Sequence, residues 1–196
     1  LFRLLKLVLS IAVLILATTY RAASEDNSKP IKAGVIGLDA HALPWTKIIN
    51  APEATGVFAD MQVVAAVPGG STDIPQSMKL LEERQKEVAE LGVEIVDSIE
   101  QLLPKVDVVM VLSIDGRKHL EEVRPVFAAG KPVFIDKPIA ASLSDAIKIF
   151  RQAEKHKVPC FSSSSLRFAK RTLNIRDDPK LGEVVGCDQY APCPLE

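Results

Sequence analysis

The sequence has few of the residues that mark several specialised classes of protein. Aromatic residues make up 5% of its 196 residues, and 24 basic residues are balanced by 25 acidic ones. A low aromatic content argues against a surface that stacks on bases, and a net charge of −1 excludes the basic footprint of a nucleic-acid-binding domain. The three cysteines form no C-x-x-C pair and accompany no histidine-rich segment, so we expect no metal site.

The cysteines also give little sign of a disulfide framework, because their number is odd. We expect Cys160 to be a buried thiol and Cys187 and Cys193 to be unpaired. A bond between Cys187 and Cys193 in an oxidising compartment is the alternative.

The first 23 residues differ from everything that follows. Arg3 and Lys6 precede an apolar run from Leu7 to Ala17, and small residues follow at Ala22 and Ala23. This order is typical of a secretory signal peptide, and the run is shorter than the roughly 20 residues that span a bilayer. We therefore expect a secreted or periplasmic protein, with an uncleaved membrane anchor at residues 1–23 as the alternative.

Short apolar runs alternate with helical patterns between residues 31 and 162, after a polar linker at residues 24–30. The runs are rich in Val and Ile and do not alternate with polar residues, as expected for strands covered on both faces. The alternation predicts an α/β fold with a doubly wound, Rossmann-like parallel sheet. Strands are expected at 31–36, 62–67, 93–96, 106–112, 132–135 and 158–161, and helices at 75–91, 117–129 and 142–156.

Ligands of such sheets bind at the carboxyl ends of the strands, so the turn after the first strand is the first candidate site. Of the G-x-G-x-x-G pattern that binds a dinucleotide, this turn retains Gly37, with Leu38 next to it. Asp39 replaces the second glycine, and Ala42 is an accepted third residue. Asp39 either places a carboxylate where a diphosphate would lie or caps the helix, which is the commoner role. His41 either faces a ligand or packs against the protein.

The second strand lacks the terminal carboxylate that usually holds the ribose hydroxyls of NAD. Gly69, Gly70 and Ser71 follow it instead and offer N–H groups and a hydroxyl, which suit an additional phosphate. This favours NADP over NAD, although no arginine lies beside the turn in the sequence. A plain surface turn is the alternative.

Two later segments follow the fourth and fifth strands. The first runs from Ser113 to His119 and leads into a helix, and the second consists of Asp136, Lys137 and Pro138. At this place Lys137 puts an ammonium group in the ligand crevice, where it can hydrogen-bond a nicotinamide ribose or a substrate oxygen. The alternative is a surface ion pair between Asp136 and Lys137.

These segments resemble the glucose-fructose oxidoreductase, inositol dehydrogenase and MocA (Gfo/Idh/MocA) family. The family's Glu-Lys-Pro is matched by residues 136–138, and its A-G-K-x-V-x-x-x-K-P framework by Ala129 to Pro138. His119 matches the histidine of a T-P-N-x-x-H segment, and Arg167 and Phe168 match a later R-F pair. The resemblance extends from Ile31 to about Cys187; it is specific in the second half and poor at the phosphate loop.

The resemblance implies NAD(P)-dependent oxidation or reduction of a small molecule, a sugar or polyol. It implies that Lys137 positions or polarises the reacting oxygen, that Arg167 contacts the substrate, and that the proton-transfer residue lies outside this chain. Residues 163–196 would begin a second, α+β domain, with its lead-in and first strand at 181–190.

With the turns considered above, the candidate cofactor-binding residues are Gly37, Leu38, Asp39, His41, Gly69, Gly70, Ser71, Ser113, His119, Asp136, Lys137 and Pro138. The alternative function is a non-catalytic Rossmann-fold binding or assembly module that has lost tight cofactor binding. In either case an apolar face prepared for missing structure would favour a homo-oligomer.

Overall fold

The strands form one parallel sheet in the order β3-β2-β1-β4-β5-β6 in a computed structural model that describes residues 29–176, 178–183 and 185–186. The order reverses between β1 and β4, so a crevice at the carboxyl ends of these strands is the expected ligand site. The expected doubly wound Rossmann-like sheet is confirmed. The strands are β1 (Ile31–Ile36), β2 (Met61–Val67), β3 (Glu94–Ile95), β4 (Val108–Val111), β5 (Val133–Ile135) and β6 (Cys160–Ser162).

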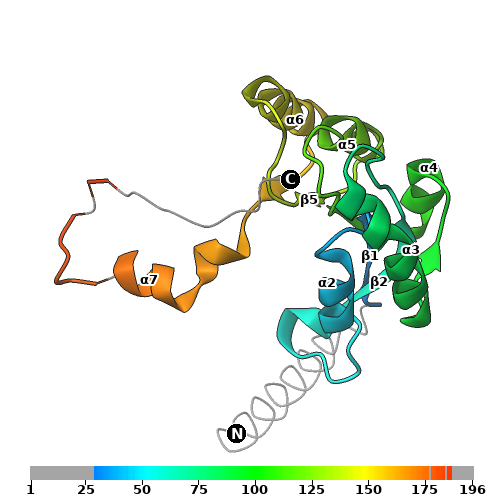
Figure 1. Ribbon diagram of the computed structural model, residues 1–196, viewed down its shortest axis with the longest axis horizontal. Helices are drawn as coiled ribbons and strands as arrows, with labels where there is room; N and C mark the ends of the chain where they lie inside the picture. Colours follow the sequence, from blue (N-terminus) through cyan, green and yellow to red (C-terminus); the bar gives the residue numbers. More distant parts are fainter. Residues whose placement is uncertain (1–28, 177, 184, 187–196) are drawn as a thin grey trace, which may run out of the picture.

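Helices cover the two faces of this sheet (Figure 1). Two clusters of buried hydrophobic residues lie between the layers. One packs the sheet against α2 and α3, and the other packs it against α4, α5 and α6. The α-helices are α2 (Ala42–Ile49), α3 (Pro75–Glu90), α4 (Ile99–Leu102), α5 (His119–Ala128), α6 (Leu143–His156) and α7 (Lys170–Arg176), and the 3-10 helices are η1 (Gly56–Phe58), η2 (Leu103–Lys105) and η3 (Ser165–Phe168).

The three expected helices form with small changes at their ends. Ser142 caps α6 by accepting a hydrogen bond from the N–H of Asp145 over 3.1 Å, as the sequence predicts. Helix α5 begins at His119, two residues later than expected. The delay has a local cause, because the Asp115 carboxylate accepts the N–H of Arg117 and holds it in a turn.

The sheet face beneath α2 is only partly covered. Trp45 of α2, Phe134 of β5 and Phe161 of β6 form a row of aromatic rings across this face, with centroids 5.4 and 5.2 Å apart. They line an apolar cavity of about 470 Å³. Helix α7, which follows β6, lies away from the sheet (Figure 1), and Phe161 is 61% exposed.

Several of the expected features lie at the two ends of the chain. Residues 1–28 and the cysteines at 187 and 193 lie outside the described part, as do residues 187–190 of the expected strand; positions 181–183 and 185–186 form no strand. No described helix is long and apolar enough to cross a membrane.

Cys160 is half-buried and not fully buried as expected, because β6 is the edge strand. Burial raises the pKa of its thiol to about 11.

Candidate nucleotide-binding site

The turns after β1, β2 and β4 pack backbone against backbone at Gly37. Gly37 has a φ of +87°, and its N–H donates to the carbonyl of Val67 over 3.0 Å. A Cβ atom at Gly37 would lie 2.4 Å from the backbone nitrogen of Ser113, and one at Gly69 would lie 3.0 Å from the Cα of Gly37. The glycine is therefore needed for contacts within the protein as well as for the tight turn.

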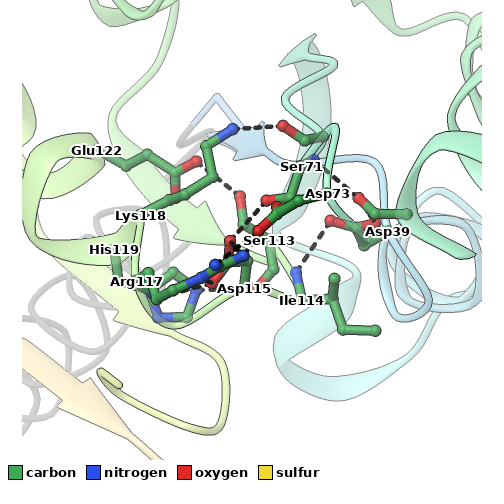
Figure 2. Close-up of polar contacts among 12 residues, drawn as sticks. Asp39, Ser71, Asp73, Ser113, Ile114, Asp115, Arg117, Lys118, His119 and Glu122 are labelled. Atoms are coloured by element: carbon green, nitrogen blue, oxygen red, sulfur yellow. Dashed lines mark hydrogen bonds and ion pairs between the residues drawn. The ribbon is translucent and has the colours of Figure 1, made fainter. Parts of the chain in front are cut away.

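Asp39 lies in the turn after β1, at the carboxyl ends of the strands, and is 2% exposed. One carboxylate oxygen accepts the hydroxyl of Ser77 on α3 over 2.8 Å, and the other accepts the N–H of Ile114 over 2.9 Å (Figure 2). His41, not Asp39, occupies the N-cap position of α2, and no side chain caps this helix. The expectation that Asp39 is a helix cap is therefore wrong, because its carboxylate joins the turn after β1 to α3 and to the loop after β4.

A second buried carboxylate, Asp115, joins the loops after β2 and β4. It accepts the hydroxyl of Ser71 over 2.7 Å and the guanidinium of Arg117 over 2.8 Å (Figure 2). Arg117 also makes a bidentate pair with Asp73, with distances of 2.7 and 2.9 Å. The hydrogen bonds from Arg117 hold the pKa of Asp115 well below its usual range, with a smaller contribution from Ser71 and against the effect of burial.

No basic residue adjoins the turn at Gly69, Gly70 and Ser71 in the sequence. The structure brings two there, since Arg117 reaches Ser71 through Asp115 and the ammonium of Lys118 donates to the carbonyl of Gly70. These residues come from the loop after β4, which meets the loop after β2 although β1 lies between the two strands. No local feature of the sequence indicates this proximity.

His119 lies beneath the loops and not in the crevice. Its ring is fully buried, with Nε2 2.8 Å from the carbonyl oxygen of Ser113 and Nδ1 3.2 Å from that of Ile139. It therefore ties the loop after β4 to the segment after β5. Next to it, the Ser113 hydroxyl donates to Glu122 over 2.8 Å. Burial raises the pKa of Glu122, although this hydrogen bond and the nearby charges of His119 and Lys118 oppose the shift.

The Asp-Lys-Pro segment meets the first turn. The Nδ1 of His41 hydrogen-bonds a carboxylate oxygen of the buried Asp136, whose other oxygen accepts the N–H of Lys137 over 2.7 Å. The alternative of an Asp136–Lys137 ion pair is therefore wrong, because Asp136 is engaged by His41. The Lys137 side chain is exposed at the end of β5, and its ammonium takes part in none of the hydrogen bonds of the described residues.

Arg167 and Pro138 have different surroundings. Pro138 packs against the loop after β4, since a Cβ at Gly116 would lie 3.2 Å from its Cγ. Arg167 lies in η3, within the segment that leaves the sheet after β6, and is exposed (Figure 1). The structure does not bring Arg167 into the crevice.

The residues at these strand ends fit the diphosphate of a dinucleotide only in part. The N–H of Ile114, the hydroxyls of Ser71 and Ser77, and the Arg117 guanidinium already donate to carboxylates, whereas no side chain caps the N-terminus of α2. The carboxylates of Asp39, Asp73 and Asp115 gather here, and Arg117 is shared between the last two (Figure 2). A diphosphate would compete with these carboxylates for the same donors and would add negative charge beside them.

Comparison with known proteins identifies the family. Residues 31–164, more than half of the chain, match the model of the Gfo/Idh/MocA oxidoreductase family with an NAD-binding Rossmann fold, and the chain belongs to this family. No curated protein matches the sequence.

Solved structures share the fold at low sequence identity. A scyllo-inositol dehydrogenase from Lactobacillus casei with bound NAD(H) and scyllo-inositol is 22% identical, with a TM-score of 0.57 over 79% of this chain and 43% of its own. An NAD-binding protein from Listeria innocua is 20% identical, with a TM-score of 0.60 over 76% of this chain and 40% of its own. An oxidoreductase from Agrobacterium radiobacter in complex with NAD+, L-tartaric acid and magnesium is 20% identical, with a TM-score of 0.56 over 72% and 37%. The chain thus spans less than half the length of each of these structures.

The packing at Gly37 predicts an unequal effect of two glycine substitutions. Gly37 and Gly130 both have positive φ, +87° and +69°, but a Cβ at Gly130 would meet nothing within 4 Å. Gly130→Ala should lower the free energy of unfolding by about 1–2 kcal/mol for the left-handed backbone alone. Gly37→Ala should lower it at least twice as far, because Ser113 must also move. Urea denaturation measures both losses, and equal losses would show that the three turns are not tightly packed.

The lowered pKa of Asp115 predicts a pH-dependent contribution to stability. The folded state releases this proton more readily than the unfolded chain, so the stabilisation is present above about pH 4 and is lost as the pH falls below it. Asp115→Asn should cost about 2 kcal/mol at pH 7, and the difference from the unaltered chain should shrink between pH 4 and pH 2.5. Thermal unfolding of both chains across this range is the measurement. A difference that does not change with pH would contradict the assignment.

Proposed function

We propose that this chain is the nucleotide-binding domain of an NAD(P)-dependent oxidoreductase that acts on a sugar or polyol, a small-molecule substrate. The observation that carries the proposal is the contact between His41 and Asp136, which joins the residue before Lys137 to the turn after β1. Family membership and the inositol and NAD ligands of structural neighbours support it. A nicotinamide cofactor would supply the hydride in such a reaction.

Lys137 would position the ligand. Its side chain is exposed at the carboxyl end of β5 and is not tied to Asp136, so the ammonium is available to a ribose hydroxyl or to the oxygen of a substrate. The backbone N–H of Lys137 is fixed by Asp136, which anchors the start of the side chain.

Within this proposal we favour NADP over NAD. Residues 69–71 contain no carboxylate, the neighbouring Asp73 and Asp115 are both engaged by Arg117, and Lys118 donates to the carbonyl of Gly70. Asp73, the exposed partner of Arg117, would have to yield to the additional phosphate.

The second candidate is a non-catalytic Rossmann-fold module that uses its surface for binding or assembly. The hydrogen bonds of Asp39 and Asp115 favour this candidate, because they engage donors of the strand-end loops without any ligand. The aromatic row on the sheet, of which Phe161 is exposed, would suit a homo-oligomer. Export directed by residues 1–23, to the periplasm or the exterior, is a further proposal that applies to either candidate.

Titration of the full chain with NADPH and NADH, followed by fluorescence, distinguishes the two candidates. Saturable binding at micromolar concentrations, tighter for NADPH, is the expected result, and no binding at millimolar cofactor would select the non-catalytic module.

Lys137→Ala should weaken the binding of NADPH about tenfold, the effect of losing one hydrogen bond from a charged group. Lys148→Ala, which removes an exposed lysine paired with Asp145 on α6, is the matched control and should leave binding unchanged. The dissociation constants come from the same fluorescence titration. If both variants behave alike, Lys137 does not contact the cofactor.

A further inference from the structure

We infer that Asp39 is an internal competitor of the nucleotide, a residue that sets affinity by occupying the place of the diphosphate. The inference rests on the proposed function, since it concerns the same crevice. It adds a specific role for a residue that replaces a glycine of the dinucleotide-binding pattern.

The first support is the set of bonds that Asp39 makes. A carboxylate resembles a phosphate in offering several acceptor oxygens to N–H and O–H donors. Asp39 uses both of its oxygens, on the Ile114 N–H at 2.9 Å and on the Ser77 hydroxyl at 2.8 Å, and these donors come from two different elements (Figure 2). A ligand anion entering between the turn after β1 and the loop after β4 would need the same donors.

The second support is the burial of this contact. Asp39 is 2% exposed and Asp115 is 7% exposed, so neither carboxylate is a mobile surface group. Ser77 links them, because its oxygen also accepts the N–H of Ser71, whose hydroxyl donates to Asp115. To admit a diphosphate the protein must turn Asp39 out of this network and leave Ile114 and Ser77 to the ligand.

The third support is charge. A diphosphate adjacent to Asp39 would add negative charge to a crevice that also contains Asp115, and Arg117 is already shared between Asp115 and Asp73. Inside a protein such like-charge contacts are weakly screened. The affinity of the unaltered chain for NADPH or NADH is therefore reduced by the carboxylate itself and not by a missing binding surface.

The experiment compares two variants of Asp39 in the full chain with a matched control. Asp39→Asn removes the charge and keeps an oxygen for the Ile114 N–H, whereas Asp39→Gly restores the glycine and empties the position. The control is Asp107→Asn, because Asp107 also accepts a backbone N–H, that of Lys32 over 2.9 Å, but next to the opposite ends of the strands. NADPH and NADH are titrated by fluorescence, and thermal unfolding establishes that each variant is folded.

We expect both Asp39 variants to bind the two cofactors at least about tenfold more tightly than the unaltered chain, with Asp107→Asn unchanged. If Asp39→Gly does not fold, Asp39→Asn alone gives the result. Binding by the Asp39 variants but not by the unaltered chain would also support the inference, while it would select the non-catalytic module for the natural sequence.

Two results would overturn the inference. If the unaltered chain binds NADPH at micromolar concentrations and the Asp39 variants bind no better, Asp39 does not compete with the diphosphate and the proposed function stands. If neither the unaltered chain nor any Asp39 variant binds at millimolar cofactor, both the inference and the cofactor-binding function are wrong.

Discussion

The close packing of Gly37 against Ser113 and Gly69 is the constraint on which the rest of the crevice depends. With the backbone nitrogen of Ser113 2.4 Å from the place where a Cβ would stand, the turns after β1, β2 and β4 leave no room for a side chain at Gly37. The side chain two residues after Gly37 is therefore directed into the space between these turns. A glycine at that position would leave the space to a ligand, and Asp39 fills it.

Buried carboxylates that stay ionised in such a place need hydrogen-bond partners, because an unpaired buried charge costs several kcal/mol. Asp39 meets this requirement with donors from α3 and the loop after β4, and Asp115 with Ser71 and Arg117. The strand-end loops thus hold one another in place by internal ion pairs and hydrogen bonds. In a dinucleotide-binding domain without these carboxylates, the same donors would remain available to phosphate oxygens.

The sequence predicts the layers of this fold well and the content of its crevice poorly. Strands and long helices follow from apolar runs and from caps such as Ser142, because these signals are local. The role of Asp39 is not local: cap statistics favour a helix cap, but the partners Ser77 and Ile114 lie 38 and 75 residues away. The proximity of Arg117 to Ser71 is not local either, since it depends on the Asp115 carboxylate, which joins the loops after β2 and β4 although β1 separates these strands.

The His41–Asp136 contact links the turn after β1 to the end of β5. It joins the turn that contains Asp39 to the segment that contains Lys137, and the His41 ring stacks on Trp45 with centroids 5.1 Å apart. His41 is the N-cap of α2, and Trp45 lies within this helix. A movement of the first turn of α2 that releases Asp39 would therefore also shift His41, which hydrogen-bonds Asp136. Entry of a diphosphate beside Asp39 would thus be coupled to the position of Lys137. A substitution at Asp39 should therefore change the position of Lys137.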